Sequence, residues 1–211
     1  AGVAGIYQIK RLADLGIDAL VLDAAPDLGG TWYWNRYPGA RFDSESYTYG
    51  YSFSRELLDE WHWKERFSAQ PENLRYLNYV ADKFDLRKYM QFNCKVQAAT
   101  FDEASDIWRL RLGDGRELTC RFVVLAIGLL STPTLPRLEG MERFKGRSFH
   151  TFRWPHEPVD LAGKKVAIIG TGATAVQCVP LLGESAQHLY VFQRTPSSID
   201  VKNNPATDPV W

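Results

Sequence analysis

Two glycine-rich turns, one at the start of the chain and one late in it, constrain the fold more than any other feature. The later turn is complete: the apolar run 165–169 leads into Gly170, Gly172 and Ala175 in the pattern G-x-G-x-x-A. Residues 1–5 fit the last five positions of G-x-G-x-x-G, so we expect the first glycine and its strand upstream of residue 1. Such a turn between a strand and a helix lets backbone N–H groups approach a pyrophosphate. Both turns therefore predict dinucleotide-binding α/β units.

Each turn is followed at nearly the same distance by a charged residue, which is acidic after the first turn and basic after the second. Asp23 follows the expected strand 17–22 and lies 18 positions after the third position of its turn, whereas Arg194 follows the strand 189–192 and lies 19 positions after. A carboxylate at this place accepts hydrogen bonds from a ribose diol, and an arginine pairs with a 2′-phosphate. We therefore expect a site for FAD or NAD in the first unit and for NADP in the second.

Composition excludes several other classes of protein. The chain has 211 residues, is 45% hydrophobic, and balances 25 basic against 25 acidic residues, so we expect a buried core and no nucleic-acid partner. Three widely spaced cysteines indicate neither a disulfide framework nor a metal site. The longest apolar run, 122–127, is far shorter than the ~20 residues of a membrane span. We interpret it as a buried strand, and we expect a cytoplasmic protein without a membrane partner.

The remaining pattern alternates strands and helices, as in parallel α/β domains. The expected elements are helices at 6–15 and 71–84 and the strands of a meander at 96–101, 107–112 and 117–124. Residues 26–53, rich in glycine and aromatic residues, indicate an ordered functional loop. The fold class expected is α/β with two Rossmann-like domains, both incomplete in this chain. We place an FAD-binding domain at 1–135 and the start of an NADP-binding domain at 136–211, because prolines interrupt the chain near 131–136.

A longer motif carries a specific resemblance. Residues 144–155 match the pattern F-x-G-x-x-x-H-T-x-x-W-P at every fixed position, namely Phe144, Gly146, His150, Thr151, Trp154 and Pro155. This pattern is the fingerprint of type I Baeyer–Villiger monooxygenases. Residues 29–41, followed by Asp43, resemble the FAD-side signature of the same family. Over essentially its whole length, the chain is similar to the N-terminal part of these enzymes.

The resemblance implies a conversion of ketones to esters or lactones that uses NADPH and O2. In that family NADPH reduces FAD, and a peroxyflavin formed with O2 attacks the ketone carbonyl. The family's catalytic arginine is expected beyond position 211, so this fragment alone is expected to be inactive. Two alternatives stay open: an N-hydroxylating or S-oxygenating flavin monooxygenase, and a nucleotide-binding remnant without oxygenase activity.

The turns and the resemblance together assign roles to single residues. Asp43 is expected to orient the missing arginine, and His150 to serve the connection between the domains, in a structural role. The expected FAD contacts are Gly2, Gly5, Asp23, Gly30, Thr31, Trp32, Trp34, Asp43, Tyr49, Val96 and Gly128. The expected NADP contacts are Arg41, Gly170, Gly172, Ala173, Thr174, Ala175, Gln177, Arg194 and Thr195. The aromatic residues of the first set serve equally well as core packing.

Overall fold

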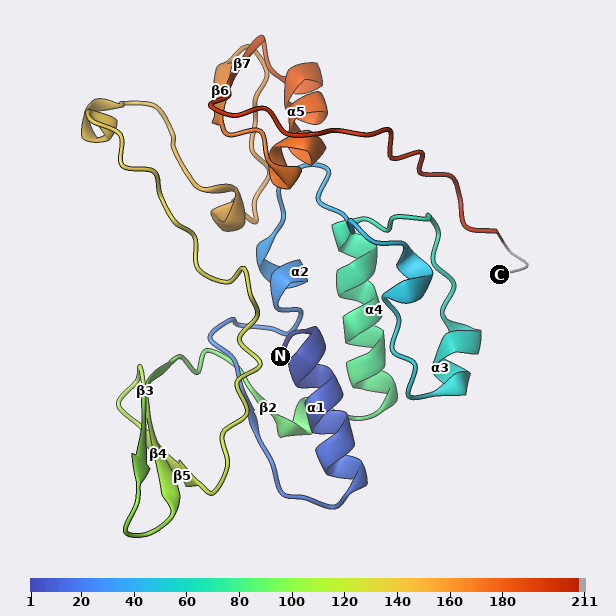
Figure 1. Ribbon diagram of the computed structural model, residues 1–211, viewed down its shortest axis with the longest axis vertical. Coiled ribbons are helices and arrows are strands. Elements are labelled where there is room, and N and C mark those ends of the chain that lie inside the picture. The colour runs from blue at the N-terminus through green and yellow to red at the C-terminus, as the bar shows by residue number, and fades with distance from the viewer. Residues whose placement is uncertain (209–211) are drawn as a thin grey trace. The chain divides into compact units, whose positions relative to one another are not determined.

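The computed structural model describes residues 1–208, which form two compact units (Figure 1). The first unit comprises Ala1–Tyr33 and Leu74–Ser131, and the second comprises Trp34–Asn73 and the chain from Thr132 onward. The segment 34–73 therefore packs with the later part of the chain, although its sequence neighbours belong to the first unit. The assignment of residues 1–135 to FAD and 136–211 to NADP stays a prediction.

In the first unit, a helix follows the first glycine turn. Helix α1 (Val3–Asp14) buries Ile6 and Ile9, which lie on one face because they are three positions apart. Strand β1 (Val21–Leu22) pairs in parallel with β2 (Met90–Gln91). The strand expected at 17–22 is therefore shorter than predicted. Strand geometry persists only where a neighbour accepts the backbone hydrogen bonds, and β2 is only two residues long.

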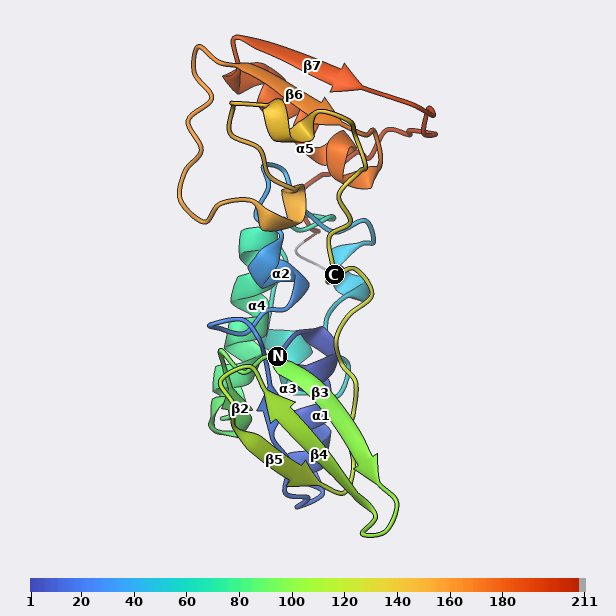
Figure 2. The same cartoon turned by 90° about the vertical axis from the view of Figure 1, so that its left-hand side faces the viewer.

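The first unit also contains the predicted meander. Strands β3 (Val96–Asp102), β4 (Ile107–Leu112) and β5 (Glu117–Cys120) form an antiparallel sheet in the order β3-β4-β5, drawn in green in Figure 2. Phe101 and Trp108 lie opposite each other in the ladder, with ring centroids 5.3 Å apart. Such cross-strand aromatic pairs are a common source of sheet stability. The meander is confirmed, and its last strand ends earlier than expected.

The apolar run 122–127 is not the buried strand that the sequence predicts. It follows β5 as irregular chain, and Phe122, Leu125 and Ile127 are 81%, 74% and 71% exposed. Apolar composition favours burial, but a strand also needs a partner for its N–H and C=O groups. No strand among residues 1–208 pairs with this run.

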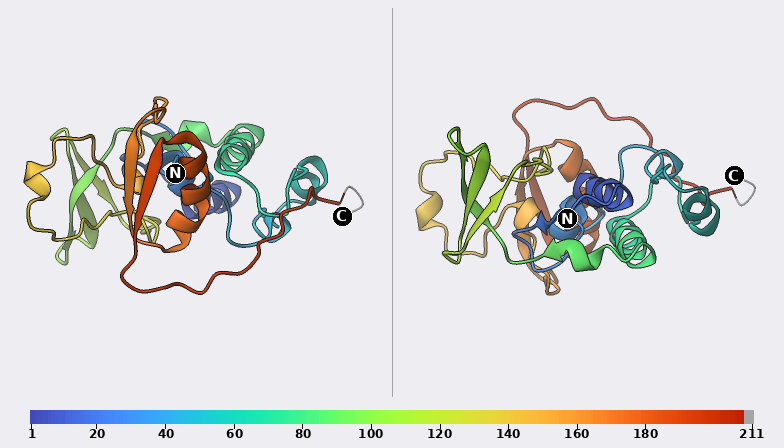
Figure 3. Two further views of the ribbon diagram at one scale, coloured as in Figure 1. Left: turned by 90° about the horizontal axis from the view of Figure 1, so that it is seen from above. Right: turned by 90° about the horizontal axis from the view of Figure 1, so that it is seen from below.

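The second unit contains a strand-turn-helix-strand motif. Strands β6 (Lys165–Ile169) and β7 (His188–Phe192) pair in parallel, and helix α5 (Ala173–Ser185) connects them and packs on them, as Figure 3 shows. The helix buries Ala175, Cys178 and Leu182, whose spacing of three and four positions places them on one face. Both strands were predicted to within one residue, and a helix was expected to begin at the turn.

The other helices are shorter or link the two units along the chain. Helix α4 (Gln70–Lys83) confirms the helix expected at 71–84 and buries Leu77 and Val80. Helices α2 (Thr31–Trp34) and α3 (Arg55–Glu60) were not predicted. The Ser54 side chain caps α3 by accepting the Leu57 N–H at 3.2 Å. The 3₁₀ turns are Ser46–Thr48, Arg87–Tyr89, Met141–Arg143 and Thr151–Arg153.

Candidate functional site

The first glycine turn is closed by a nearby segment of its own unit. Gly2 is the N-cap of α1, and a Cβ atom built on Gly30 would lie 2.7 Å from the Gly2 Cα atom. Gly30 has φ +53°, so a side chain there would be strained as well as crowded. The Gly29 N–H also donates to the Ala1 carbonyl at 2.9 Å. Only glycine at position 30 therefore permits this backbone approach.

Asp23 lies beside the first turn, as its place after β1 predicts. One carboxylate oxygen accepts the Ala25 N–H at 2.8 Å, and the other lies beside the Ala1 nitrogen. A Cβ on Gly5 would lie 3.9 Å from both the Val21 and the Ala126 side chains, so the segment leading to Gly128 passes the turn. Of the other expected FAD contacts, Trp32 is 8% exposed, Thr31 begins α2, and Val96 begins β3 with 40% exposure.

The space beside the glycines of the second turn is empty. Gly170 follows β6, Gly172 is the N-cap of α5, and a Cβ atom on either would meet nothing within 4 Å. Ala173, Thr174 and Ala175 form the first turn of α5, whose leading N–H groups have no partner within the helix. A helix N-terminus beside open space suits a bound phosphate.

The loop after β7 is tied to the second turn through one residue. Gln193 Nε2 donates to Thr171 Oγ1 at 2.9 Å, and Ser197 Oγ donates to the Thr171 carbonyl at 2.9 Å. Because Thr171 lies between the two turn glycines, these bonds hold the intervening Arg194 and Thr195 near the turn. Arg194 is exposed there. The structure thus brings the turn glycines, the first turn of α5, Arg194 and Thr195 together.

Residues 37–43, called here the Asp43 loop, dock on helix α5 within the second unit. A Cβ on Gly39, which has φ +80°, would lie 2.3 Å from the Gln177 carbonyl oxygen. The Tyr37 hydroxyl donates to Gln177 Oε1 at 2.9 Å, and Gln177 Nε2 donates to Asp43 Oδ1 at 3.0 Å. The loop that carries the expected catalytic aspartate is therefore fixed to the helix that follows the second turn.

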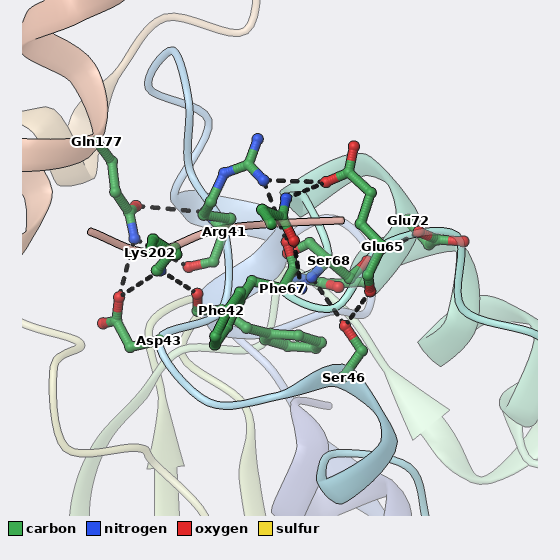
Figure 4. A network of polar contacts seen from close by, with 12 residues as sticks. Arg41, Phe42, Asp43, Ser46, Glu65, Phe67, Ser68, Glu72, Gln177 and Lys202 are labelled. Atoms are coloured by element: carbon green, nitrogen blue, oxygen red, sulfur yellow. Dashed lines mark hydrogen bonds and ion pairs between the residues drawn. The ribbon is translucent and has the colours of Figure 1, made fainter. Parts of the chain in front are cut away.

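Lys202 lies beside Asp43, and the Arg41 guanidinium points away from it (Figure 4). The Asp43 side chain is 71% exposed and lies 3.4 Å from Lys202 Nζ. The Arg41 guanidinium instead binds Glu65 at 3.0 Å and the Phe67 carbonyl at 3.2 Å. Any contact of Arg41 with NADP would thus compete with Glu65. Sequence reasoning missed Lys202, because an isolated lysine 159 positions from Asp43 carries no local signal.

The segment 202–207 runs back along 64–67 and holds Lys202 in place. Asn204 accepts the Phe67 N–H at 2.7 Å and donates to Glu65 at 2.8 Å. An antiparallel bridge joins Glu65 to Ala206, and Lys202 Nζ donates to the Phe42 carbonyl at 2.8 Å. This segment, red in Figure 1, therefore supports both ends of the Asp43–Lys202 contact.

The fingerprint segment 144–155 is organised by its own side chains. A Cβ on Gly146 would lie 2.5 Å from the Phe144 ring, which folds over that glycine. His150 Nδ1 accepts the Phe152 N–H at 3.1 Å and so caps the 3₁₀ turn that Thr151 begins. Trp154 contacts the Phe149 ring edge-on, with centroids 5.0 Å apart. The pattern thus encodes a self-supporting 3₁₀ turn, which ends at Arg153 with Trp154 as its C-cap.

Two aromatic residues expected near a flavin have partners in the second unit. Tyr49 packs on Phe42 with ring centroids 3.8 Å apart. Trp34 stacks on the buried Phe152 at 6.2 Å, and the Arg153 guanidinium lies 5.4 Å from the Trp34 ring centre. Both rings therefore have a packing role, and their contact with flavin stays a prediction.

Burial changes the acidity of Tyr37, in the Asp43 loop, and of Cys178, on α5. It raises the pKa of the Tyr37 phenol above its ordinary value of 10.0, although a hydrogen bond with the Thr174 side chain opposes the shift. Burial also raises the pKa of the Cys178 thiol. Both groups are therefore neutral at pH 7.

Other kinds of site find no support within residues 1–208. No three or more His, Cys, Asp or Glu side chains in this range are placed to hold a metal ion. None of the helices in the same range has the length and apolar character needed to cross a membrane.

Known proteins share this arrangement. Residues 1–203 match the model of the flavin-binding monooxygenase-like family. The chain is 48% identical over 203 residues to 2-oxo-Δ3-4,5,5-trimethylcyclopentenylacetyl-CoA monooxygenase of Pseudomonas putida, covering 93% of this chain and 37% of that protein. It is 44% identical over 210 residues to a Baeyer–Villiger monooxygenase of Pseudooceanicola batsensis, covering 99% and 38%.

A relative with different chemistry also matches. Phenazine N-monooxygenase PhzNO1 of Lysobacter antibioticus is 44% identical over 195 residues, covering 92% of this chain and 36% of that protein. Among solved structures, the OTEMO complex with FAD and NADP superposes with a TM-score of 0.94 at 46% identity, covering 100% of this chain and 40% of that one. The chain thus spans less than two fifths of the length of these curated relatives. The resemblance to Baeyer–Villiger monooxygenases and the α/β class are confirmed, and the chain belongs to the flavin-binding monooxygenase-like family.

Proposed function

We propose that this chain is part of an enzyme that uses FAD, NADPH and O2 to insert one oxygen atom beside a ketone carbonyl, giving an ester or a lactone. The observation that carries the proposal is the fingerprint segment 144–155, which is complete in sequence and forms a self-supporting turn. The Baeyer–Villiger relatives support the same reaction. Ketone and O2 are the partners, and the three free cysteines fit a reducing, cytoplasmic location.

The first turn fits FAD. The N-terminus of α1 directs its leading N–H groups toward a pyrophosphate, and Asp23, at the end of β1, offers a carboxylate to a ribose diol. Gly2, Gly5 and Gly30 keep the backbone clear of side chains. When bound, the flavin supplies hydride acceptance and O2 activation, and the chain's residues bind and orient it.

The second turn fits NADPH. Open space in front of Gly170 and Gly172 leaves room for a pyrophosphate at the N-terminus of α5. Arg194 and Thr195, held near the turn through Thr171, would bind the 2′-phosphate by charge-assisted hydrogen bonds. On this assignment, residues 1–135 serve FAD and those from 136 onward serve NADP.

Asp43 would act on the chemistry through an arginine from outside this chain. Its exposed carboxylate is held at a fixed point by Gln177 and Lys202, so it can orient a guanidinium brought to it. Orientation of this guanidinium matters because a charge that is held in place before the reaction stabilises the transition state best. His150 has a structural part, because its ring nitrogen is used as a helix cap.

A second candidate reaction is N-oxygenation, favoured by the identity to phenazine N-monooxygenase. The full-length protein should be incubated with NADPH and O2 and with a cyclic ketone, an aromatic N-heterocycle or a thioether, and the products identified. A lactone as the main product supports the proposal. An N-oxide or sulfoxide as the main product overturns it in favour of the second class, and a protein that holds nucleotide but oxidises no NADPH would be a binding remnant.

A further inference from the structure

We propose that Gln177 is a positioning residue for the Asp43 loop and makes no direct contact with the nucleotide. Its consequence for catalysis rests on the proposed function, because it acts through Asp43. The sequence pattern places Gln177 among the expected NADP contacts, since it lies in the first two turns of α5. The structure directs its side chain elsewhere.

The amide of Gln177 is fully used within the second unit. Oε1 accepts the Tyr37 hydroxyl at 2.9 Å and the Arg41 N–H at 3.3 Å, and Nε2 donates to the Arg41 carbonyl at 3.2 Å and to Asp43 Oδ1 at 3.0 Å. A primary amide has two donor hydrogens and two acceptor lone pairs. All four positions are therefore occupied, and every partner belongs to the Asp43 loop. Figure 4 shows Gln177 against Arg41 and Asp43.

The loop depends on this side chain because it has little regular structure of its own. Residues 37–43 contain no helix and only a single-residue bridge, at Arg41. Gly39 brings the loop backbone against the Gln177 carbonyl, and the amide then fixes Arg41 and Asp43. The other holder of the carboxylate, Lys202, is more distant at 3.4 Å and comes from irregular chain. Of the two residues that bind the Asp43 carboxylate, only Gln177 lies on a helix.

Two substitutions separate positioning from nucleotide contact. Gln177→Leu removes all four hydrogen bonds at similar size. Gln177→Glu keeps the acceptor oxygen but places a second oxygen opposite Asp43 Oδ1 and the Arg41 carbonyl. Two carboxylates at this distance repel until they share a proton. The other groups facing this point are Lys202 Nζ and the Tyr37 phenol, since the Arg41 guanidinium is turned to Glu65.

The first measurement uses the full-length protein without NADP(H). Hydrogen exchange followed by mass spectrometry reports the amides of residues 37–43. Because loss of a hydrogen-bonded contact of ~1.4 kcal/mol changes an equilibrium tenfold, Gln177→Leu should speed exchange in this peptide by roughly tenfold or more. Gln187→Leu is the matched control, as Gln187 is exposed just beyond the same helix. It should leave exchange in the loop unchanged.

The second measurement compares NADP⁺ affinity with turnover. Gln177→Leu should leave the Kd for NADP⁺ within about threefold while lowering kcat for ketone oxygenation roughly 10- to 100-fold. Gln177→Glu should regain activity relative to wild type as pH falls from 8 to 6, because its protonated form can again donate to Asp43. Gln177→Leu should show no such recovery.

Distinct outcomes overturn the two proposals. A tenfold weaker NADP⁺ affinity with unchanged exchange in residues 37–43 would make Gln177 a nucleotide contact. Should Gln177→Leu not fold, unchanged exchange and the absence of pH recovery in Gln177→Glu would equally overturn the positioning role. A wild-type protein that does not oxygenate ketones overturns the proposed function alone, while exchange still tests the positioning.

Discussion

The two glycine turns share a sequence pattern but differ in what fills the space that the glycines leave. At the first, a Cβ on the turn glycine Gly2 would lie 3.3 Å from the Gly30 Cα atom, and one on Gly30 would lie 2.7 Å from the Gly2 Cα atom, so the protein's own backbone uses the space. At the second, a Cβ on Gly170 or Gly172 would meet nothing within 4 Å. A glycine motif therefore predicts that some group packs closely against the backbone of the turn. It does not say whether that group belongs to the protein or to a ligand.

The charged residue after each turn shows the same contrast. Asp23 is 17% exposed and one of its carboxylate oxygens accepts the Ala25 N–H at 2.8 Å, so its own unit already orients it. Arg194 is exposed on a loop that is itself tied down through Thr171. The first site is built largely before a ligand arrives, whereas the second offers an accessible charge beside an open helix N-terminus. Four substitutions test this difference.

The largest effect should come from Gly30→Ala, because the methyl group would be strained at φ +53° and would overlap the Gly2 backbone. We expect the free energy of unfolding to fall by roughly 2–4 kcal/mol. Gly172→Ala is the matched control and should cost about 1 kcal/mol or less, since its φ of −74° is ordinary and the space is open. Urea denaturation of the full-length variants measures both. Equal losses would remove the distinction between a closed and an open turn.

Asp23→Ala should release FAD while sparing NADP. Removing the carboxylate leaves ribose hydroxyls unpaired, a loss of roughly 1–3 kcal/mol in flavin binding. The ratio of bound flavin to protein after purification measures it, and the NADP⁺ Kd of the remaining holoenzyme is the control. An unchanged flavin content would show that Asp23 only ties the start of its own unit together.

Arg194→Ala should weaken NADPH by one to two decades and leave NADH nearly unchanged, because charge-assisted hydrogen bonds to a 2′-phosphate contribute about 1.5–3 kcal/mol. The dissociation constants of both nucleotides in the full-length protein measure the effect. Salt should reduce the difference between them, since the arginine is exposed. Equal losses for the two nucleotides would assign Arg194 to the fold.

How much could be predicted from the sequence depended on whether the signal was local. Strand β6, helix α5 and strand β7 lie close together in the chain, and their hydrophobic spacing and turn glycines specify them without distant help. The run 122–127 was misassigned because its burial requires partners that its own residues cannot specify. Helix α3 carried a local signal, the capping Ser54, which went unused.

Prediction of the candidate site was limited in the same way, to residues with a local sequence signal. The turn glycines, Asp23 and Arg194 could be proposed as site residues because fixed spacings tie them to the turns. The surroundings of Asp43 were not found, because Gln177 is 134 positions away and Lys202 is 159 positions away. Gln177 was expected to contact NADP, and the positioning role proposed above differs from that expectation, since a position in a motif says which element a residue lies on and not where its side chain points.

The smallest effect tests whether the Asp43 loop covers helix α5. Tyr37→Phe removes the hydroxyl that donates to Gln177 Oε1 at 2.9 Å and should lower the free energy of unfolding by about 0.5–1.5 kcal/mol at pH 8. Burial raises the pKa of Tyr37 in the folded state above 10.0, so the unfolded chain ionises first as pH rises. The stability that this shift contributes is complete below pH 10 and is lost as pH rises through the folded pKa.

The wild type should therefore lose stability more steeply than Tyr37→Phe between pH 9 and 11 in urea denaturation. Parallel losses over that range would mean that the phenol is solvated in the folded protein and that the Asp43 loop does not cover α5.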